Sequence, residues 1–208
     1  MAVRPRSPRG EGERLRATLL DVATELLAEV HDIDRLSVRA VTSRAGVSPT
    51  ALYMHFADKD ELVDAIKHRC FTALREWVAA AGAEADDPRA RLYAMGKAYL
   101  SFARERAGWY AVCFQTRFGE AQEDNLPPAR DTEDADALVF LDLMDAVAAV
   151  VETSEEELFE ISTVIWAALH GRASLLQAMP VCPLPDEDRW LSRLAQIVIG
   201  PEPEPAGA

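Results

Sequence analysis

The segment from Leu36 to Leu62 constrains the fold more than any other part of this 208-residue chain. Its sequence, LSVRAVTSRAGVSPTALYMHFADKDEL, contains two short helical stretches separated by Gly-Val-Ser and then the start of a longer helix. Ser37 is placed to cap the first stretch, because a hydroxyl there accepts a backbone N–H that the helix leaves unpaired. Leu36 can pack on Val41 as a hydrophobic staple across that cap.

A turn separates the two short helices. Gly46 tolerates the left-handed backbone conformation that ends a helix and turns the chain. Ser48 and Pro49 then supply a cap and a residue whose φ is already helical, so a second helix starts there. Asp58 and Glu61 form a capping box for the longer helix that follows. The short helix before Asp58 therefore carries the recognition surface, as in a helix-turn-helix that reads the DNA major groove.

These residues resemble the DNA-binding domain of the TetR family of bacterial transcriptional repressors. The resemblance covers about Leu15 to Trp77 and rests on the Gly46-Val47-Ser48 turn, the Leu52-Tyr53-Met54-His55-Phe56 helix and Lys59. It implies an all-α fold of about nine helices, with an N-terminal three-helix DNA-binding domain before a helical domain for ligand binding and dimerisation. It also implies the partners, which are double-stranded DNA carrying an inverted-repeat operator, a small-molecule effector and a second copy of the chain. Repression is the family's usual mode.

The resemblance implies a set of DNA-contacting residues: Ser37, Arg39, Ser48, Thr50, Ala51, Tyr53, His55 and Lys59. Ser37 is expected to hold a phosphate, whereas Arg39 is expected to reach a base edge, where its fork suits O6 and N7 of guanine. The alternative for Arg39 is a solvated surface charge, because phosphate contacts outnumber base contacts in such interfaces. Tyr53 and His55 are expected on phosphates or a thymine methyl, and Lys59 on a phosphate at the start of the longer helix.

The net charge of −13 is distributed unevenly along the chain. Residues 1–59 carry nine Lys/Arg and eight Asp/Glu, a net of +1, while residues 60–208 carry thirteen against twenty-seven, a net of −14. We expect residues 1–12 to form a disordered basic arm that neutralises phosphates or enters a minor groove. The alternative is a disordered leader that only aids solubility. The acidity belongs to the second domain and does not argue against DNA binding.

Hydrophobic periodicity predicts the domain organisation. We expect a DNA-binding domain at 13–58, a connector helix at 59–81, an effector-binding and dimerisation domain at 82–200 and a disordered tail at 201–208. The first helix, 13–30, should bury a stripe of Leu15, Leu19, Val22, Leu26 and Val30. The connector should present Leu62, Ile66, Cys70, Ala73 and Trp77.

The second domain reads as helical throughout. We expect one helix to begin at Pro88 and another to span 109–114. The next helix should present one apolar side made of Leu138, Leu141, Met144, Ala148 and Val151. A helix that begins at Ser154, with Glu157 completing a capping box, and a last helix over 186–199 should follow. Residues 117–134 contain glycine, two prolines and many acids, which predicts a mobile loop. The helix after Ser154 has so little polar surface that other helices must cover two of its sides.

The Trp166-Ala-Ala-Leu169-His170-Gly171 segment resembles a motif in the effector-binding domain of one TetR subgroup. In the family, the last two helices pack against their copies in a second subunit. Small and apolar faces on these helices favour the same arrangement, because small residues let two helices approach closely. The expected dimer interface comprises Ala167, Ala168, Gly171, Leu175, Trp190, Leu194 and Ile197.

Aromatic and methionine residues that point inward are expected to line an effector pocket: Met95, Tyr99, Phe102, Trp109, Phe114, Met144, Trp166 and His170. The alternative for most of them is ordinary core packing. Trp166 and His170 are four residues apart, so an indole and an imidazole would share a cavity wall suited to a mostly apolar effector.

Several functional classes are not supported. The chain has no GxSxG, P-loop, HExxH or paired-cysteine spacing, so we expect no enzyme activity, no cofactor and no metal. Its three cysteines are expected to be core filler, and with no signal-peptide or membrane-spanning pattern they indicate a cytoplasmic protein. One rival hypothesis keeps DNA binding but makes the acidic second domain a platform for a protein partner, without a small-molecule ligand.

Overall fold

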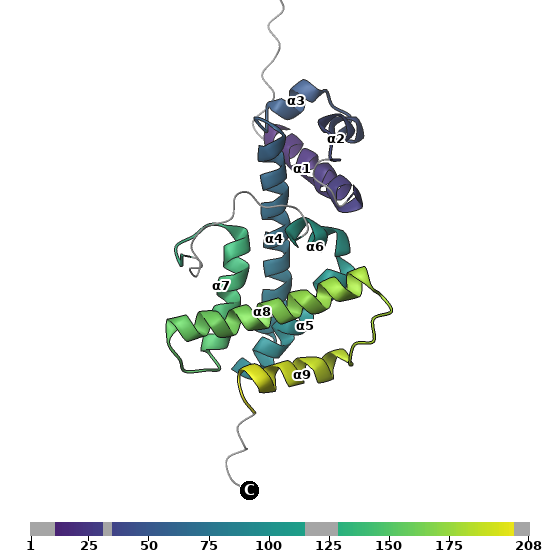
Figure 1. The fold of residues 1–208 in the computed structure, drawn as a ribbon. Coiled ribbons are helices and arrows are strands. Elements are labelled where there is room, and N and C mark those ends of the chain that lie inside the picture. The colour runs from purple at the N-terminus through teal and green to yellow at the C-terminus, as the bar shows by residue number, and fades with distance from the viewer. Residues whose placement is uncertain (1–10, 31–34, 115–128, 202–208) are drawn as a thin grey trace, which may run out of the picture. The chain divides into compact units, whose positions relative to one another are not determined.

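The computed structural model describes residues 11–30, 35–114 and 129–201, and every regular element within these ranges is an α-helix (Figure 1). The bounds are α1 Glu11–Val30, α2 Val38–Ala45, α3 Pro49–Tyr53, α4 Lys59–Ala83, α5 Pro88–Glu105, α6 Ala107–Phe114, α7 Ala135–Ala148, α8 Glu155–Ala178 and α9 Glu187–Val198. The predicted all-α fold class is confirmed.

Three predicted segments fall wholly or largely outside the described residues. They are the basic arm at 1–12, the loop at 117–134 and the tail at 201–208. Glu11 and Gly12, which the prediction assigned to the arm, already belong to α1.

The chain divides into two compact units. The first contains α1, α2, α3, the part of α4 up to Cys70, and α6 from Gly108; the second contains the rest of α4, then α5, α7, α8 and α9. Helix α4 is continuous through both units. The division differs from the predicted boundaries mainly because α6 joins the first unit.

The first unit is built around α1 and the start of α4. Leu19 and Leu27 of α1 are fully buried with Leu62 and Ile66 of α4. The predicted stripe on α1 is displaced, since Leu27 is buried whereas Leu26 is only half-buried. The cause is a helix from far along the chain. Helix α6 passes so close to α1 that a Cβ at Gly108 would lie 2.7 Å from the backbone oxygen of Ala28.

In the second unit, two helices also bury a face next to the predicted one. Helix α4 buries Leu74 and Val78, while Trp77 is half-buried and donates from Nε1 to Ser101 Oγ at 3.0 Å. Helix α7 buries Val147, whereas the predicted Ala148 is exposed. A 3.6-residue period permits steps of three or four, and the packing partner decides between them.

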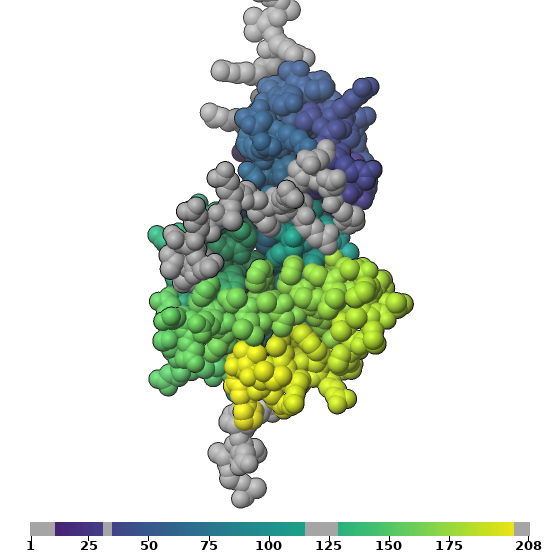
Figure 2. Space-filling view, in the orientation of Figure 1, coloured from purple at the N-terminus to yellow at the C-terminus, as the bar shows by residue number. Residues whose placement is uncertain are grey.

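Helices α8 and α9 cover one face of the second unit (Figure 2). Helix α8 begins as predicted, because Ser154 Oγ accepts from the Glu157 N–H at 3.2 Å. Arg172 lies between α8 and α9 with only 7% of its surface exposed. Its Nη2 donates to the Pro185 carbonyl at 2.9 Å, and its guanidinium lies 5.0 Å from the Trp190 ring centre. These contacts hold the start of α9 against α8.

Candidate nucleic-acid interface and cavity

Short-range hydrogen bonds define α2 and α3, the two helices of the predicted helix-turn-helix, which we call the reader. Ser37 Oγ accepts from Ala40 N at 3.1 Å and caps α2, and Ser48 Oγ accepts from Ala51 N at 3.3 Å and caps α3. Gly46 ends α2 with a φ of 70°, the left-handed conformation that glycine adopts without a Cβ penalty. The predicted caps and turn are therefore confirmed residue by residue.

The inner face of α3 anchors it to the unit. Leu52 is fully buried, and Phe56, just after the helix, has 1% of its surface exposed. The Arg16 guanidinium of α1 lies 4.8 Å from the centre of the Phe56 ring. Burial on this side leaves the opposite side of α3 facing solvent.

Five of the eight predicted DNA contacts are open to solvent: Ser37, Arg39, Ser48, Thr50 and Tyr53. Ala51, His55 and Lys59 are half-buried. Tyr53 exposes 51% of its surface and its neighbour Met54 exposes 79%. Met54, the C-cap of α3, was not among the predicted contacts, although an apolar side chain this exposed suits a thymine methyl.

The start of α4 is already capped by the protein. Glu61 N donates to Asp58 Oδ1 at 2.8 Å, and Glu61 Oε2 accepts from Ala57 N at 2.6 Å. This is the predicted capping box, with the return bond one residue earlier than in the usual form. Lys59, the first residue of α4, adds its ammonium charge at this capped helix end.

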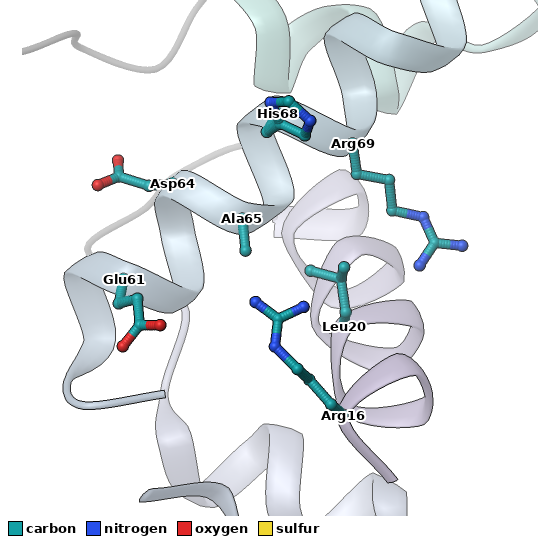
Figure 3. A pocket seen from close by; sticks show the side chains of 7 residues that line it. All are labelled: Arg16, Leu20, Glu61, Asp64, Ala65, His68 and Arg69. Atoms are coloured by element: carbon teal, nitrogen blue, oxygen red, sulfur yellow. The ribbon is translucent and has the colours of Figure 1, made fainter. Parts of the chain in front are cut away.

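A shallow groove of about 400 Å³ runs between α1 and α4 in the first unit (Figure 3). Arg16 and Leu20 line it from α1, and Arg16 extends into the space between the helices. From α4 it is lined by Glu61, Asp64, Ala65, His68 and Arg69. Arg69 also pairs with Asp21 of α1, so charged groups of both signs hold this seam together.

The second unit contains a much larger cavity, of about 1110 Å³. Its walls come from α5, α7, α8 and α9, with Val78 of α4 adding to one wall. Apolar side chains such as Leu92, Leu143, Ile165 and Leu169 make up most of the lining. This size is slightly above the usual range of small-molecule sites, and a predominantly apolar lining is typical of them.

The cavity includes only part of the predicted effector set. Met95, Tyr99 and Trp166 line it. Phe102 and Met144 are buried in the packing between helices and do not line it, which is the alternative that the sequence left open. Trp109 and Phe114 belong to α6 in the first unit, where Trp109 lies 5.8 Å from the Arg69 guanidinium.

His170 stands behind the cavity wall rather than on it. Its ring stacks on Trp166 with centres 5.8 Å apart, and its Nδ1 lies 3.3 Å from the Tyr99 hydroxyl. Its Nε2 lies 3.4 Å from Ser174 Oγ. Burial lowers the pKa of the His170 imidazole below its ordinary value of 6.5. A neutral ring therefore supports the two aromatic side chains that do face the cavity.

The predicted dimer residues are not all on the outer surface. Ile197 and Leu175 expose 71% and 41% of their surfaces, and Ala167 is also exposed. Ala168 and Gly171 are half-buried, with open space beside Gly171. Trp190 packs on Arg172, whereas Leu194 lines the cavity of its own chain. The placement of Leu194 differs from the prediction because α9 turns part of its apolar face inward.

The prediction missed several cavity residues, notably Gly96, Arg89 and Leu191. A Cβ at Gly96 would lie 3.2 Å from Leu191 Cδ2, so the bare backbone there lets α9 approach α5. A glycine in the middle of an otherwise apolar helix was the available signal. Nothing in the local sequence marked Arg89 as a cavity residue, because its hydrogen-bond partners are backbone carbonyls far along the chain.

Among the described residues, no helix combines the length and apolarity needed to cross a bilayer. Within the same ranges, no three His, Cys, Asp or Glu side chains gather closely enough to hold a metal ion.

Family models match both units. Residues 19–66 match the model described as "Bacterial regulatory proteins, tetR family", and residues 92–198 match "Tetracyclin repressor-like, C-terminal domain". The second match alone spans just over half of the chain. The chain belongs to the TetR family. It is therefore a DNA-binding transcriptional regulator and not an enzyme.

Individual relatives agree with the family assignment. An uncharacterized HTH-type transcriptional regulator of Haemophilus influenzae is 42% identical over 50 residues, which span 24% of each protein. A TetR-family transcriptional regulator from Streptomyces coelicolor has a TM-score of 0.60 at 23% identity, covering 90% of this chain and 99% of that one. The multidrug binding protein EbrR has a TM-score of 0.64 at 18% identity, covering 99% and 100%. At these identities, the two solved structures show a shared fold.

Proposed function

We propose that this TetR-family chain is a repressor that binds an inverted-repeat operator as a homodimer and is released by a small, mostly apolar effector. The observation that carries the proposal is the cavity of about 1110 Å³ in the second unit. The space is partly open to solvent, since Asp87, Ser192 and Gln196 on its lining are exposed, and a concave, mostly apolar space of this kind is where small molecules usually bind.

Exposed polar side chains on α2 and α3 support the DNA contacts in this proposal. Ser37, Thr50 and Tyr53 are open to solvent on helices whose other faces are buried. Arg39, in the first turn of α2, is exposed and can reach a base edge, while Lys59 supplies charge for a phosphate. These assignments come from the family resemblance and from exposure.

A symmetric dimer is supported by the outer face of α8. Val164 and Leu175 are large, apolar and exposed, and Ala167, Ala168 and Gly171 lie between them in sequence. Small residues between larger apolar ones let a second helix approach closely, and a two-fold axis makes the face its own partner. Two readers related by that axis require half-sites with the same symmetry.

Helix α4 supplies a physical link between effector and operator. It begins with Lys59, contains Leu62 and Ile66 of the first unit's core, and continues to Val78, which lines the cavity. A ligand that displaces Val78 therefore acts on the same helix whose first turns belong to the DNA-binding unit. If the effector lowers the affinity for DNA by a certain factor, thermodynamic linkage requires DNA to lower the affinity for the effector by the same factor, typically about 5–150-fold.

The test uses the purified full chain and DNA flanking its own gene, with fluorescence anisotropy as the readout of binding. A collection of small apolar compounds is screened for release of the DNA. Leu143→Trp should then fill cavity space, leaving DNA affinity unchanged and abolishing release. Leu138→Trp is the matched control, because Leu138 lies on α7 but does not line the cavity.

Two further variants distinguish the cavity wall from its support. Trp166→Ala should abolish release, because the indole lines the cavity. His170→Ala should weaken release by loosening Trp166 and Tyr99, again with DNA affinity nearly intact. If Leu143→Trp and Trp166→Ala both still release DNA fully when the effector is added, the second unit would instead be a platform for a protein partner.

A further inference from the structure

Two charged side chains, Asp87 and Arg89, line the otherwise neutral cavity. Asp87 is exposed, and its Oδ1 caps α5 by accepting from the Ala90 N–H at 2.9 Å. The positive end of the α5 dipole further compensates this carboxylate. The negative charge at the cavity is therefore already matched by the protein.

Arg89 has no such match. Its Nη1 donates to the Gly200 carbonyl at 3.1 Å and its Nη2 to the Ile199 carbonyl at 3.2 Å, and both partners are neutral. Within the part of the chain that the structure describes, its guanidinium forms no ion pair with an Asp or Glu. Arginine stays protonated in proteins and carries five N–H donors, so charge and donors both remain for an anion.

The rest of the lining specifies an apolar body. Leu92 follows Arg89 by three residues on α5, and Ile165 and Leu169 face the same cavity from α8. The Tyr93 hydroxyl, one turn beyond Arg89 on α5, is already occupied, since it donates to Asp188 at 2.8 Å. A ligand that satisfies both parts has one negative group at one end and an apolar remainder.

We propose that the cavity takes an apolar monocarboxylic acid, with its carboxylate on Arg89 and its body against Leu92, Ile165 and Leu169. The proposal rests on the proposed function and names the chemical class of the effector. A carboxylate matches the planar guanidinium fork with two parallel hydrogen bonds. It competes for Arg89 with the Ile199 and Gly200 carbonyls, so binding also loosens the link between the start of α5 and the end of α9.

Three probes of equal chain length test the class: decanoic acid, decanol and decyltrimethylammonium. Binding to the full chain is followed by tryptophan fluorescence, because Trp166 lines the cavity. We expect the acid to bind about tenfold or more tightly than the alcohol, as is typical of a charge-assisted hydrogen bond, and the ammonium to bind most weakly. The acid should also release DNA at the lowest concentration.

Variants locate the carboxylate. Arg89→Gln should lower the affinity for decanoic acid about tenfold, to that for decanol, and should leave decanol binding unchanged, which shows that the cavity is intact. Arg89→Lys should keep part of the preference. Arg91→Gln is the matched control, because Arg91 is exposed on the same helix and does not line the cavity. A chain ending at residue 201, which lacks Glu202 and Glu204, should keep the preference for the acid.

Different failures carry different conclusions. Equal binding of acid and alcohol by the unaltered chain would overturn the acid class while leaving a small-molecule effector in place. If no compound bound or released DNA, the proposed function itself would fall. A preference that survives Arg89→Gln but is lost in Arg172→Gln would overturn the assignment to Arg89, because Arg172 is buried with Nε and Nη1 unpaired among the described residues.

Discussion

The two units of the chain are packed in opposite ways. In the first, α6 comes within contact of the α1 backbone at Gly108, and a shallow groove of about 400 Å³ lies between α1 and α4. In the second, four helices and part of α4 leave a cavity of about 1110 Å³. A reader of DNA gains from rigidity, whereas a responsive unit needs space whose filling changes its shape. The contrast matches the two roles that we propose.

The largest effect should come from the DNA-reading surface. Arg39→Ala should cost about 1–3 kcal/mol per base contact, twice per operator in a dimer, and should relax preference at one position of each half-site. Lys59→Ala should weaken binding to all DNA sequences alike. It should also reduce the slope of log affinity against log salt concentration by about one unit per lost phosphate contact. Competition anisotropy at several salt concentrations measures both quantities.

The control is effector binding, which both variants should retain because neither residue lies in the second unit. Equal loss of sequence preference from both substitutions would show that the two roles are assigned wrongly. Loss of effector binding in either would contradict the separation of the two units by function.

Glycine substitutions test the difference in packing directly. Gly108→Ala puts a Cβ 2.7 Å from the Ala28 backbone and should cost about 1–3 kcal/mol of unfolding free energy, as overpacking does. In the dissociated protomer, Gly171→Ala meets nothing within 4 Å and should gain up to about 1 kcal/mol from helix propensity. Urea unfolding followed by circular dichroism compares the two. Similar changes of the same sign would remove the contrast between tight and open packing.

The same contrast explains what the sequence could predict. Ser37, Gly46, Ser48 and the Asp58–Glu61 box act on residues three or four positions away, and each was identified from local pattern alone. The fold class followed from those signals and from helical periodicity. The residues that contact DNA, effector and partner subunit stay predictions.

Long-range packing set what local pattern could not show. The buried face of α1 depends on α6, and both Arg89 and Leu194 line the cavity because α9 packs along α5. Periodicity marks a residue as facing inward but does not separate a cavity wall from a filled core. Phe102 and Met144 were therefore placed at the wall together with Tyr99 and Trp166.

Matched serine caps, one in each unit, give a smaller effect. Ser48→Ala and Ser154→Ala each remove a hydroxyl that accepts the N–H three residues on, at 3.3 and 3.2 Å, and each should cost about 1 kcal/mol. Only Ser48→Ala should also weaken DNA binding, because that cap lies at the start of the reader. Thermal unfolding and anisotropy on the same samples separate the two results. Weaker DNA binding by Ser154→Ala would indicate that local stability of the second unit is coupled to the reader.

The smallest effect concerns His170 and pH. Because burial lowers the pKa of this imidazole below 6.5 in the folded chain, the unfolded chain binds more protons once the pH falls below about 6.5. The contribution of His170 to stability is therefore complete from about one pH unit above 6.5 and declines as the pH falls toward the lowered pKa. Well above pH 6.5 the ring is neutral in both states and contributes no slope.

Urea unfolding of the chain and of His170→Gln between pH 7.5 and pH 5.5, a range of about one unit on either side of the ordinary pKa, measures this contribution. The difference in unfolding free energy between the unaltered chain and His170→Gln should be constant in the upper part of the range. As the pH falls, the unaltered chain should lose stability relative to His170→Gln. Tyr99→Phe is the control: it removes the hydroxyl 3.3 Å from Nδ1 but keeps the ring buried, so the slope should persist. A slope that vanished in Tyr99→Phe would mean that this hydroxyl, rather than burial, keeps His170 neutral behind the cavity wall.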